Sequence, residues 1–157
     1  MQYPGYETGN IRLLEGKWFP FKIHNLVQLQ DDEWYYILRD INGLKHFLPA
    51  EYYDSYGLKP GDEINCKIDR INCTGRIYLE PEHPFYKEGK IYNFDVISSP
   101  DFDQEKILLV REISGKTIEV GVPDNLNIYL NTKKMVQCLV KAIKKGKPLL
   151  EISDDYL

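Results

Sequence analysis

The segment Leu14–Ile23, with the sequence LEGKWFPFKI, returns 73 positions later as Lys87–Val96, KEGKIYNFDV. Three further matches follow in the same order, at offsets of 72 and 71 positions. They are Ile37–Gly43 with Leu109–Gly115, Cys66 with Cys138, and Gly75–Glu80 with Gly146–Glu151. A repeat of this kind defines the architecture before any local pattern does. It predicts an N-terminal extension, residues 1–10, followed by two copies of one module, residues 11–83 and 84–157.

Each module has the composition and turn signals of a β-rich domain. In the first copy we expect strands near residues 17–29, 34–40, 44–48, 62–71 and 76–80. Asn42-Gly43 and Thr74-Gly75 are typical of hairpin turns, and the segment 49–57 resembles a short helical turn ended by Gly57. Three strands, a short helix and two strands are the order of the five-stranded OB barrel. We therefore predict an all-β fold of two tandem OB-like barrels.

The closing half of the first copy resembles a known family. Leu58–Ile71, LKPGDEINCKIDRI, followed by Gly75–Leu79, GRIYL, is similar to the second half of the ribosomal S-one-type RNA-binding domain. The opening half, with Gly16 before the first strand and Gly43–His46 at the third, is similar but looser. The resemblance implies an outer surface on the first three strands that stacks bases on aromatic side chains. The second copy departs from the pattern at Gly115–Glu119, so the implied binding belongs to the first copy.

Composition sets limits on the class of protein. The 157 residues are 43% hydrophobic and 28% charged, which is typical of a folded chain. No run of about 18 apolar residues is present, and the first residues do not resemble a secretory signal, so we expect a cytoplasmic protein. The net charge of −4 excludes a strongly basic protein that binds duplex phosphates non-specifically. Three cysteines without a Cys-x-x-Cys pair argue against a zinc ribbon or a disulfide framework.

Comparing the copies separates core positions from surface positions, because side chains alternate along a strand. Positions that are apolar in both copies are expected in the barrel interior: Phe19, Phe21 and Ile23 with Tyr92, Phe94 and Val96, and Cys66 with Cys138. Trp18, Pro20, Lys22 and His24 change chemistry between the copies and are expected to face outward. With Pro49 matched to Pro123, the third strand places Lys45 and Phe47 outward and His46 inward. Both faces of the second strand are apolar, so its register stays open.

Eight residues of the first copy are candidates for binding bases or phosphates: Trp18, Lys22, Trp34, Tyr35, Arg39, Lys45, His46 and Phe47. The first copy with its leader also contains 13 of the 20 aromatic residues, and each base stacked on an aromatic face contributes about 1 to 3 kcal/mol. Three alternatives remain open. Trp18 is either a stacking residue or a cover over the other module, His46 is either a base contact or an interior histidine, and Arg39 either contacts the ligand or forms an ion pair with Asp40.

A basic cluster lies in the second copy. It contains Lys133, Lys134, Lys141, Lys144, Lys145 and Lys147. One interpretation is a solvated lysine turn. The other is a weak phosphate-contact surface, formed by Lys141, Lys144, Lys145 and Lys147, that extends the binding path of the first copy.

Catalytic motifs are missing from the sequence. It has no Gly-x-Ser-x-Gly elbow, no phosphate-binding loop and no His-Glu-x-x-His motif, and its three histidines are scattered. We therefore expect a non-catalytic protein without a metal or cofactor. The leading hypothesis is single-stranded nucleic-acid binding, with RNA favoured by the resemblance and DNA as the alternative. Two other hypotheses are a protein-protein interaction module and the N-terminal part of a longer chain.

Overall fold

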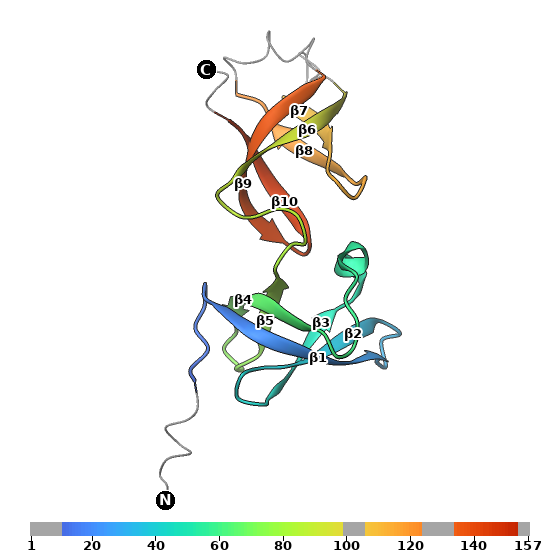
Figure 1. Cartoon of the computed structure of the whole chain (residues 1–157), viewed down its shortest axis with the longest axis vertical. Coiled ribbons are helices and arrows are strands. Elements are labelled where there is room, and N and C mark those ends of the chain that lie inside the picture. The colour runs from blue at the N-terminus through green and yellow to red at the C-terminus, as the bar shows by residue number, and fades with distance from the viewer. Residues whose placement is uncertain (1–10, 99–105, 124–133, 154–157) are drawn as a thin grey trace, which may run out of the picture. The chain divides into compact units, whose positions relative to one another are not determined.

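The computed structural model describes residues 11–98, 106–123 and 134–153. Within these ranges ten strands form two five-stranded antiparallel sheets, and one short helix connects two strands of the first sheet (Figure 1). The chain divides into unit 1, Met1–Glu82, and unit 2, His83–Leu157, and each unit contains one sheet. The all-β fold of two tandem barrel-like units is therefore confirmed. No helix among the described residues is long and apolar enough to cross a membrane, and the N-terminal extension lies outside them.

The sheet of unit 1 has the strand order β3-β2-β1-β4-β5. Its strands are β1 (Trp18–Gln28), β2 (Trp34–Arg39), β3 (Lys45–Pro49), β4 (Glu63–Ile71) and β5 (Ile77–Pro81). A short 3-10 helix, η1 (Glu51–Tyr56), connects β3 to β4 and ends at Gly57, whose φ of 66° is left-handed. Glycine adopts this conformation without the steric penalty of a Cβ atom. The two outer strands, β3 and β5, contact one another, so the sheet closes almost completely into a barrel.

Unit 2 repeats this arrangement with the strand order β10-β9-β6-β7-β8. Its strands are β6 (Ile91–Ser98), β7 (Ile107–Arg111), β8 (Thr117–Gly121), β9 (Met135–Lys144) and β10 (Lys147–Ile152). The two outer strands of this sheet, β10 and β8, also contact one another. Taken in the opposite direction, β8-β7-β6-β9-β10, this order matches that of unit 1 strand for strand, as the sequence repeat predicts.

Each barrel has its own apolar core, as the matched positions predict. Phe21 and Ile23 in β1 and Phe94 in β6 are completely buried, whereas Trp18 and Lys22 are exposed. Both matched cysteines belong to these cores, and burial raises the pKa of the Cys138 thiol to about 12. A thiol held protonated in this way is a small hydrophobic residue rather than a nucleophile.

The structure shows which face of β2 is buried, and it corrects the alignment of β3 with its counterpart β8. In β2, Tyr36 and Leu38 face the core, so Tyr35 faces outward. Leu38 pairs with His46, and its counterpart in β7 pairs with Ile118. His46 therefore corresponds to Ile118, two residues away from the match obtained by aligning the prolines. The inward and outward assignments survive because a shift of two residues preserves the alternation of a strand.

A buried carboxylate organises the turn between β2 and β3. Oδ1 of Asp40 accepts hydrogen bonds from the backbone N–H groups of Asn42 at 2.8 Å and Leu44 at 3.0 Å. Its Oδ2 lies 2.7 Å from Nε2 of His46. In unit 2 the side chain of Glu112 accepts bonds from the equivalent turn. The repeated acidic residue is thus a turn cap, and the suggested ion pair between Arg39 and Asp40 is replaced by the contact with His46.

We expect Asp40→Ala to lower the free energy of unfolding of unit 1 by about 2 kcal/mol, because it leaves two part-buried backbone donors of the turn and the side chain of His46 without their acceptor. Asp40→Asn keeps one oxygen for the two backbone N–H groups, so its expected effect is less than about half as large. Urea unfolding followed by tryptophan fluorescence measures both variants. Equal destabilisation by the two substitutions would contradict the capping role.

A segment before each sheet is fastened to the turn between the second and third strands. In unit 1, the backbone of Ile11 forms two hydrogen bonds with the side chain of Asn42, at 2.6 and 2.8 Å. In unit 2, the backbone N–H of Ile113 donates to the hydroxyl of the buried Tyr86 at 2.8 Å. Nδ1 of His83 accepts bonds from the two backbone N–H groups at Phe85 and Tyr86. His83 therefore fixes the chain where unit 2 begins.

Candidate nucleic-acid interface

Three cationic residues form one row across the outer face of β1, β2 and β3. Lys22 is directly opposite Arg39, and Arg39 is directly opposite Lys45. All three are exposed, and none forms a salt bridge with another residue in the described part of the chain. Glu63 of β4 is the cross-strand neighbour of Lys22 on its other side. Like charges at facing positions repel each other, so bound anions would relieve an unfavourable arrangement.

An aromatic pair lies on the same outer face, further along β2 and β3. The rings of Tyr35 and Phe47 meet edge to face, with centroids 6.0 Å apart and an interplanar angle of 78°. Phe47 is 45% exposed. The hydroxyl of Tyr35 donates to Oδ2 of Asp31 at 3.0 Å, and this bond is the main reason that the pKa of Tyr35 is raised above 10. The tyrosine is thus held as a neutral donor, with its ring fixed beside Phe47.

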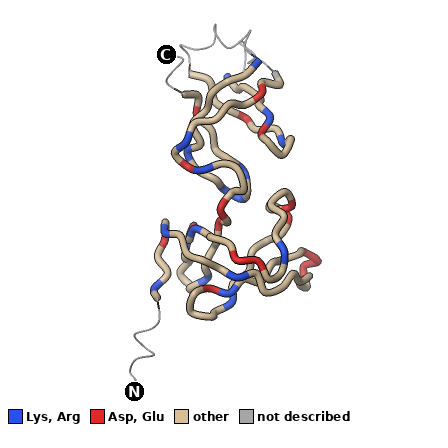
Figure 2. Tube along the Cα trace, viewed as in Figure 1, with Lys and Arg blue, Asp and Glu red and all other residues tan. Residues whose placement is uncertain are grey.

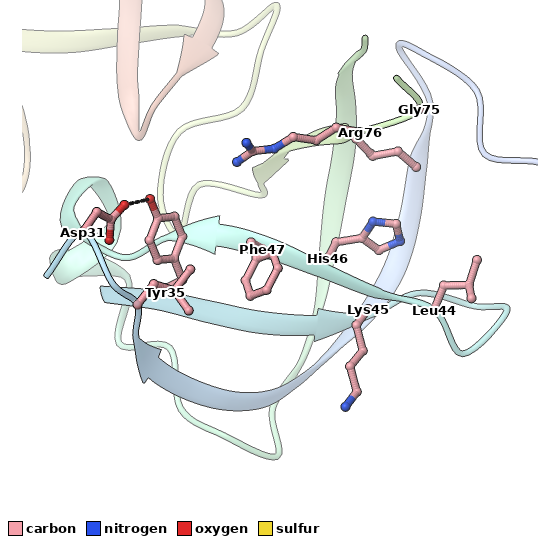
Figure 3. A pocket seen from close by; sticks show the side chains of 10 residues that line it. Asp31, Tyr35, Leu44, Lys45, His46, Phe47, Gly75 and Arg76 are labelled. Atoms are coloured by element: carbon pink, nitrogen blue, oxygen red, sulfur yellow. Dashed lines mark hydrogen bonds between the residues drawn. The ribbon is translucent and has the colours of Figure 1, made fainter. Parts of the chain in front are cut away.

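The aromatic pair borders an open pocket of about 700 Å³ (Figure 3). Its walls come from the β1–β2 hairpin, from β2 and β3, and from the β4–β5 hairpin. The lining residues are Leu29, Asp31, Tyr35, Leu44, Lys45, His46, Phe47, Gly75, Arg76 and Ile77. In OB barrels the face of the second and third strands, between these two hairpins, is a common site for oligonucleotides and oligosaccharides.

Arg76 is a pocket residue that was missing from the sequence-based candidates. Its hairpin is fixed by Asn72, whose Oδ1 accepts bonds from the backbone of Thr74 and Arg76, and by the left-handed φ of Gly75. In Figure 3 the Arg76 side chain reaches from this hairpin toward the ring of Tyr35. Its guanidinium carbon also lies 4.9 Å from the centre of the Tyr78 ring. The position of Arg76 directly after the turn glycine was the available signal.

His46 lines the pocket but is held from inside the barrel. Its side chain is 12% exposed, Nε2 is bound to Asp40, and the ring packs edge-on against Phe21 with centroids 6.0 Å apart. These contacts favour the interior interpretation of this histidine over a base-contacting one.

The two tryptophans lie outside the pocket. Trp18 is 46% exposed on the outward face of β1, opposite Lys67. It is four residues from Lys22, a separation of about 13 Å along a strand. Trp34 is 51% exposed at the beginning of β2 and alternates with Tyr35, so its side chain leaves the strand on the other face. Tyr35 is therefore the residue of this pair that contributes to the outer surface.

The lysine cluster of unit 2 is partly occupied by contacts within the unit. Lys141 forms a 3.1 Å salt bridge with Glu151, and both side chains are more than half exposed. Lys144 and Lys147 are opposite each other across the β9–β10 hairpin. Exposed salt bridges contribute about 0 to 1 kcal/mol. The salt bridge is therefore weak, and phosphate contact by Lys141, Lys144, Lys145 and Lys147 stays a prediction; Lys133 lies outside the described residues.

The equivalent outer face of unit 2 has different chemistry. Asp95, Arg111 and Thr117 occupy the row that corresponds to the three cations of unit 1. Glu119 occupies the position of Phe47. Figure 2 shows basic and acidic positions interspersed along both units. At the matched positions of unit 2, one cation therefore replaces three and an acid replaces Phe47, while Arg111 shares a separate pocket with Phe85.

No group of three or more His, Cys, Asp or Glu residues in the described ranges is placed to hold a metal ion. No protein-family model matches the sequence, and no curated protein matches it. The functional assignment therefore depends on the geometry of the outer face of unit 1.

Proposed function

We propose that unit 1 binds single-stranded nucleic acid, RNA in the first place, without catalysing a reaction on it. The observation that carries the proposal is the placement of the cationic row and the Tyr35–Phe47 pair on one face of the barrel. Strand-binding proteins combine these elements, because phosphates need positive charge and bases need aromatic faces. The resemblance of Leu58–Leu79 to S-one-type domains supports RNA over DNA.

The spacing of the two elements suits a short stretch of one strand. Arg39 is two residues from Ile37, the partner of Phe47, and four residues from Tyr35. The row of cations thus lies about 7 Å from the position of Phe47 and about 13 Å from that of Tyr35. A base stacked on Phe47 would leave its phosphate near the cations. Binding is led by stacking, which is how a protein of net charge −4 retains a polyanion.

Fluorescence anisotropy with labelled single-stranded RNA and DNA, at several salt concentrations, tests the proposal. We expect Phe47→Ala to weaken binding about tenfold, since one stacked base contributes about 1 to 3 kcal/mol. We expect Arg39→Gln to weaken binding and to reduce the slope of log K against log salt by about 0.7, the value for one contact to a single strand.

The repeat supplies a matched control. Arg111 occupies the same register position in β7 as Arg39 in β2, and both are exposed. Arg111→Gln is therefore expected to leave affinity and salt slope unchanged. Absence of binding up to ~100 μM, which is weaker than most non-specific affinities, would contradict the proposed function.

A protein-interaction module is the second candidate. The exposed Trp34, outside the nucleic-acid face, favours it, because exposed tryptophans are enriched at the energetic centres of protein interfaces. Trp34→Ala separates the two functions: it is expected to leave RNA affinity unchanged, whereas a protein partner that uses this surface would bind the variant more weakly.

A further inference from the structure

One carboxylate of the pocket retains acceptor capacity toward a ligand. Asp31 lines the pocket from the β1–β2 hairpin. Its Oδ2 accepts from the Tyr35 hydroxyl and its Oδ1 accepts from the backbone N–H of Glu33, both at 3.0 Å. An ionised carboxylate has about four acceptor sites, two on each oxygen. These bonds therefore fix the orientation of Asp31 and leave about one acceptor site on each oxygen.

We propose that Asp31 makes the pocket select guanine among the bases of a bound strand, an inference that rests on the proposed function. Guanine presents two adjacent donors, N1–H and the N2 amino group, which match the two oxygens of a carboxylate. Uracil has a single ring donor between two carbonyl oxygens, and these repel a carboxylate. Adenine and cytosine present an amino group beside a ring nitrogen that is itself an acceptor.

The opposite chemistry is supplied by the second hairpin. Arg76 brings a guanidinium to the pocket from the β4–β5 side. Arginine pairs with the O6 and N7 acceptors of guanine. The pocket thus offers an acceptor group on one hairpin and a donor group on the other, with Phe47 as a stacking surface on β3 between them. Guanine is the base that carries a pair of donors and a pair of acceptors on neighbouring edges.

Inosine gives the sharpest test, because it keeps the purine ring, O6, N7 and N1–H and lacks the N2 amino group. Three labelled RNA nonamers are compared by anisotropy: all uridine, uridine with one central guanosine, and uridine with one central inosine. With the wild-type chain we expect guanosine to bind about tenfold more tightly than inosine, the lower part of the range for a bidentate base contact. The uridine nonamer is expected to bind most weakly.

The Asp31→Asn variant should reduce the ratio of guanosine to inosine affinity to about two or less, because the amide replaces one acceptor with a donor. Asp32→Asn is the matched control. It removes the same charge one residue away, and asparagine tolerates the left-handed φ of 63° at that position. This control is expected to keep the full ratio.

Each remaining outcome is decisive. Equal affinity for guanosine and inosine in the wild type, or an unchanged ratio in Asp31→Asn, would overturn the guanine proposal while leaving strand binding intact. Failure of all three nonamers and their DNA equivalents to bind would overturn the proposed function itself, and the guanine proposal with it.

Discussion

Phe94→Ala is expected to lower the free energy of unfolding of unit 2 by about 3 to 5 kcal/mol and to leave the unfolding of unit 1 unchanged. Phe94 is 1% exposed and lies in a core cluster formed entirely by residues of unit 2. Replacing a buried phenylalanine removes apolar contacts and leaves a cavity that the neighbouring side chains fill only in part. A small domain has about 5 to 15 kcal/mol of stability, so the variant brings unit 2 close to its limit.

The distribution of tryptophan allows the two units to be followed separately. Both tryptophans of the chain, Trp18 and Trp34, belong to unit 1. Tryptophan fluorescence therefore reports the unfolding of unit 1, while far-UV circular dichroism reports both sheets. Phe94→Ala should shift only the dichroism transition to lower urea concentration. Phe21→Ala, the counterpart in unit 1, should shift the fluorescence transition. A fluorescence transition that moves with Phe94→Ala would show that the two units unfold as one.

The fold could be predicted from the sequence because the duplication allows each strand to be compared with its counterpart in the other copy. Positions such as Phe21 and Phe94 remain apolar in both copies, since each barrel must fill its interior, and this constraint marks the inward face. The proline in this region does not occupy equivalent positions in the two copies. Pro49 ends β3, whereas Pro123 lies two residues beyond the end of β8, so matching them displaced the alignment.

The candidate site was harder to predict, for a physical reason. The pocket combines Tyr35 and Phe47, which neighbouring strands bring together, with Asp31 and Arg76, which two different hairpins supply. Contacts between hairpins depend on how the barrel closes, and no periodicity in the sequence records that. Comparison of the copies is also least informative here. A candidate binding residue such as Phe47 differs from its counterpart Glu119 because the outer face is not required for folding.

Acidification is expected to destabilise unit 2 through His83. This residue is 7% exposed, and burial, together with the nearby charge of Lys116, lowers its pKa from 6.5 to about 4. The folded state thus binds the proton more weakly than the unfolded state. The contribution of neutral His83 to the free energy of unfolding is fully present above pH 6.5 and is lost as the pH falls toward 4. The full difference corresponds to about 3 kcal/mol, of which about 2 kcal/mol is lost between pH 7 and pH 5.

His83→Asn isolates this effect, because asparagine keeps the hydrogen bonds without the titration. Oδ1 of asparagine lies as many bonds from the backbone as Nδ1 of histidine, and can accept from the N–H groups of Phe85 and Tyr86 in the same way. Urea unfolding followed by circular dichroism at pH 7 and pH 5 should show wild-type unit 2 losing about 2 kcal/mol more than the variant. His24→Asn, at an exposed position of β1, should behave as the wild type. Protonation places a hydrogen on Nδ1 and removes its acceptor lone pair, so identical losses in wild type and His83→Asn would contradict His83 as the cause of the acid destabilisation.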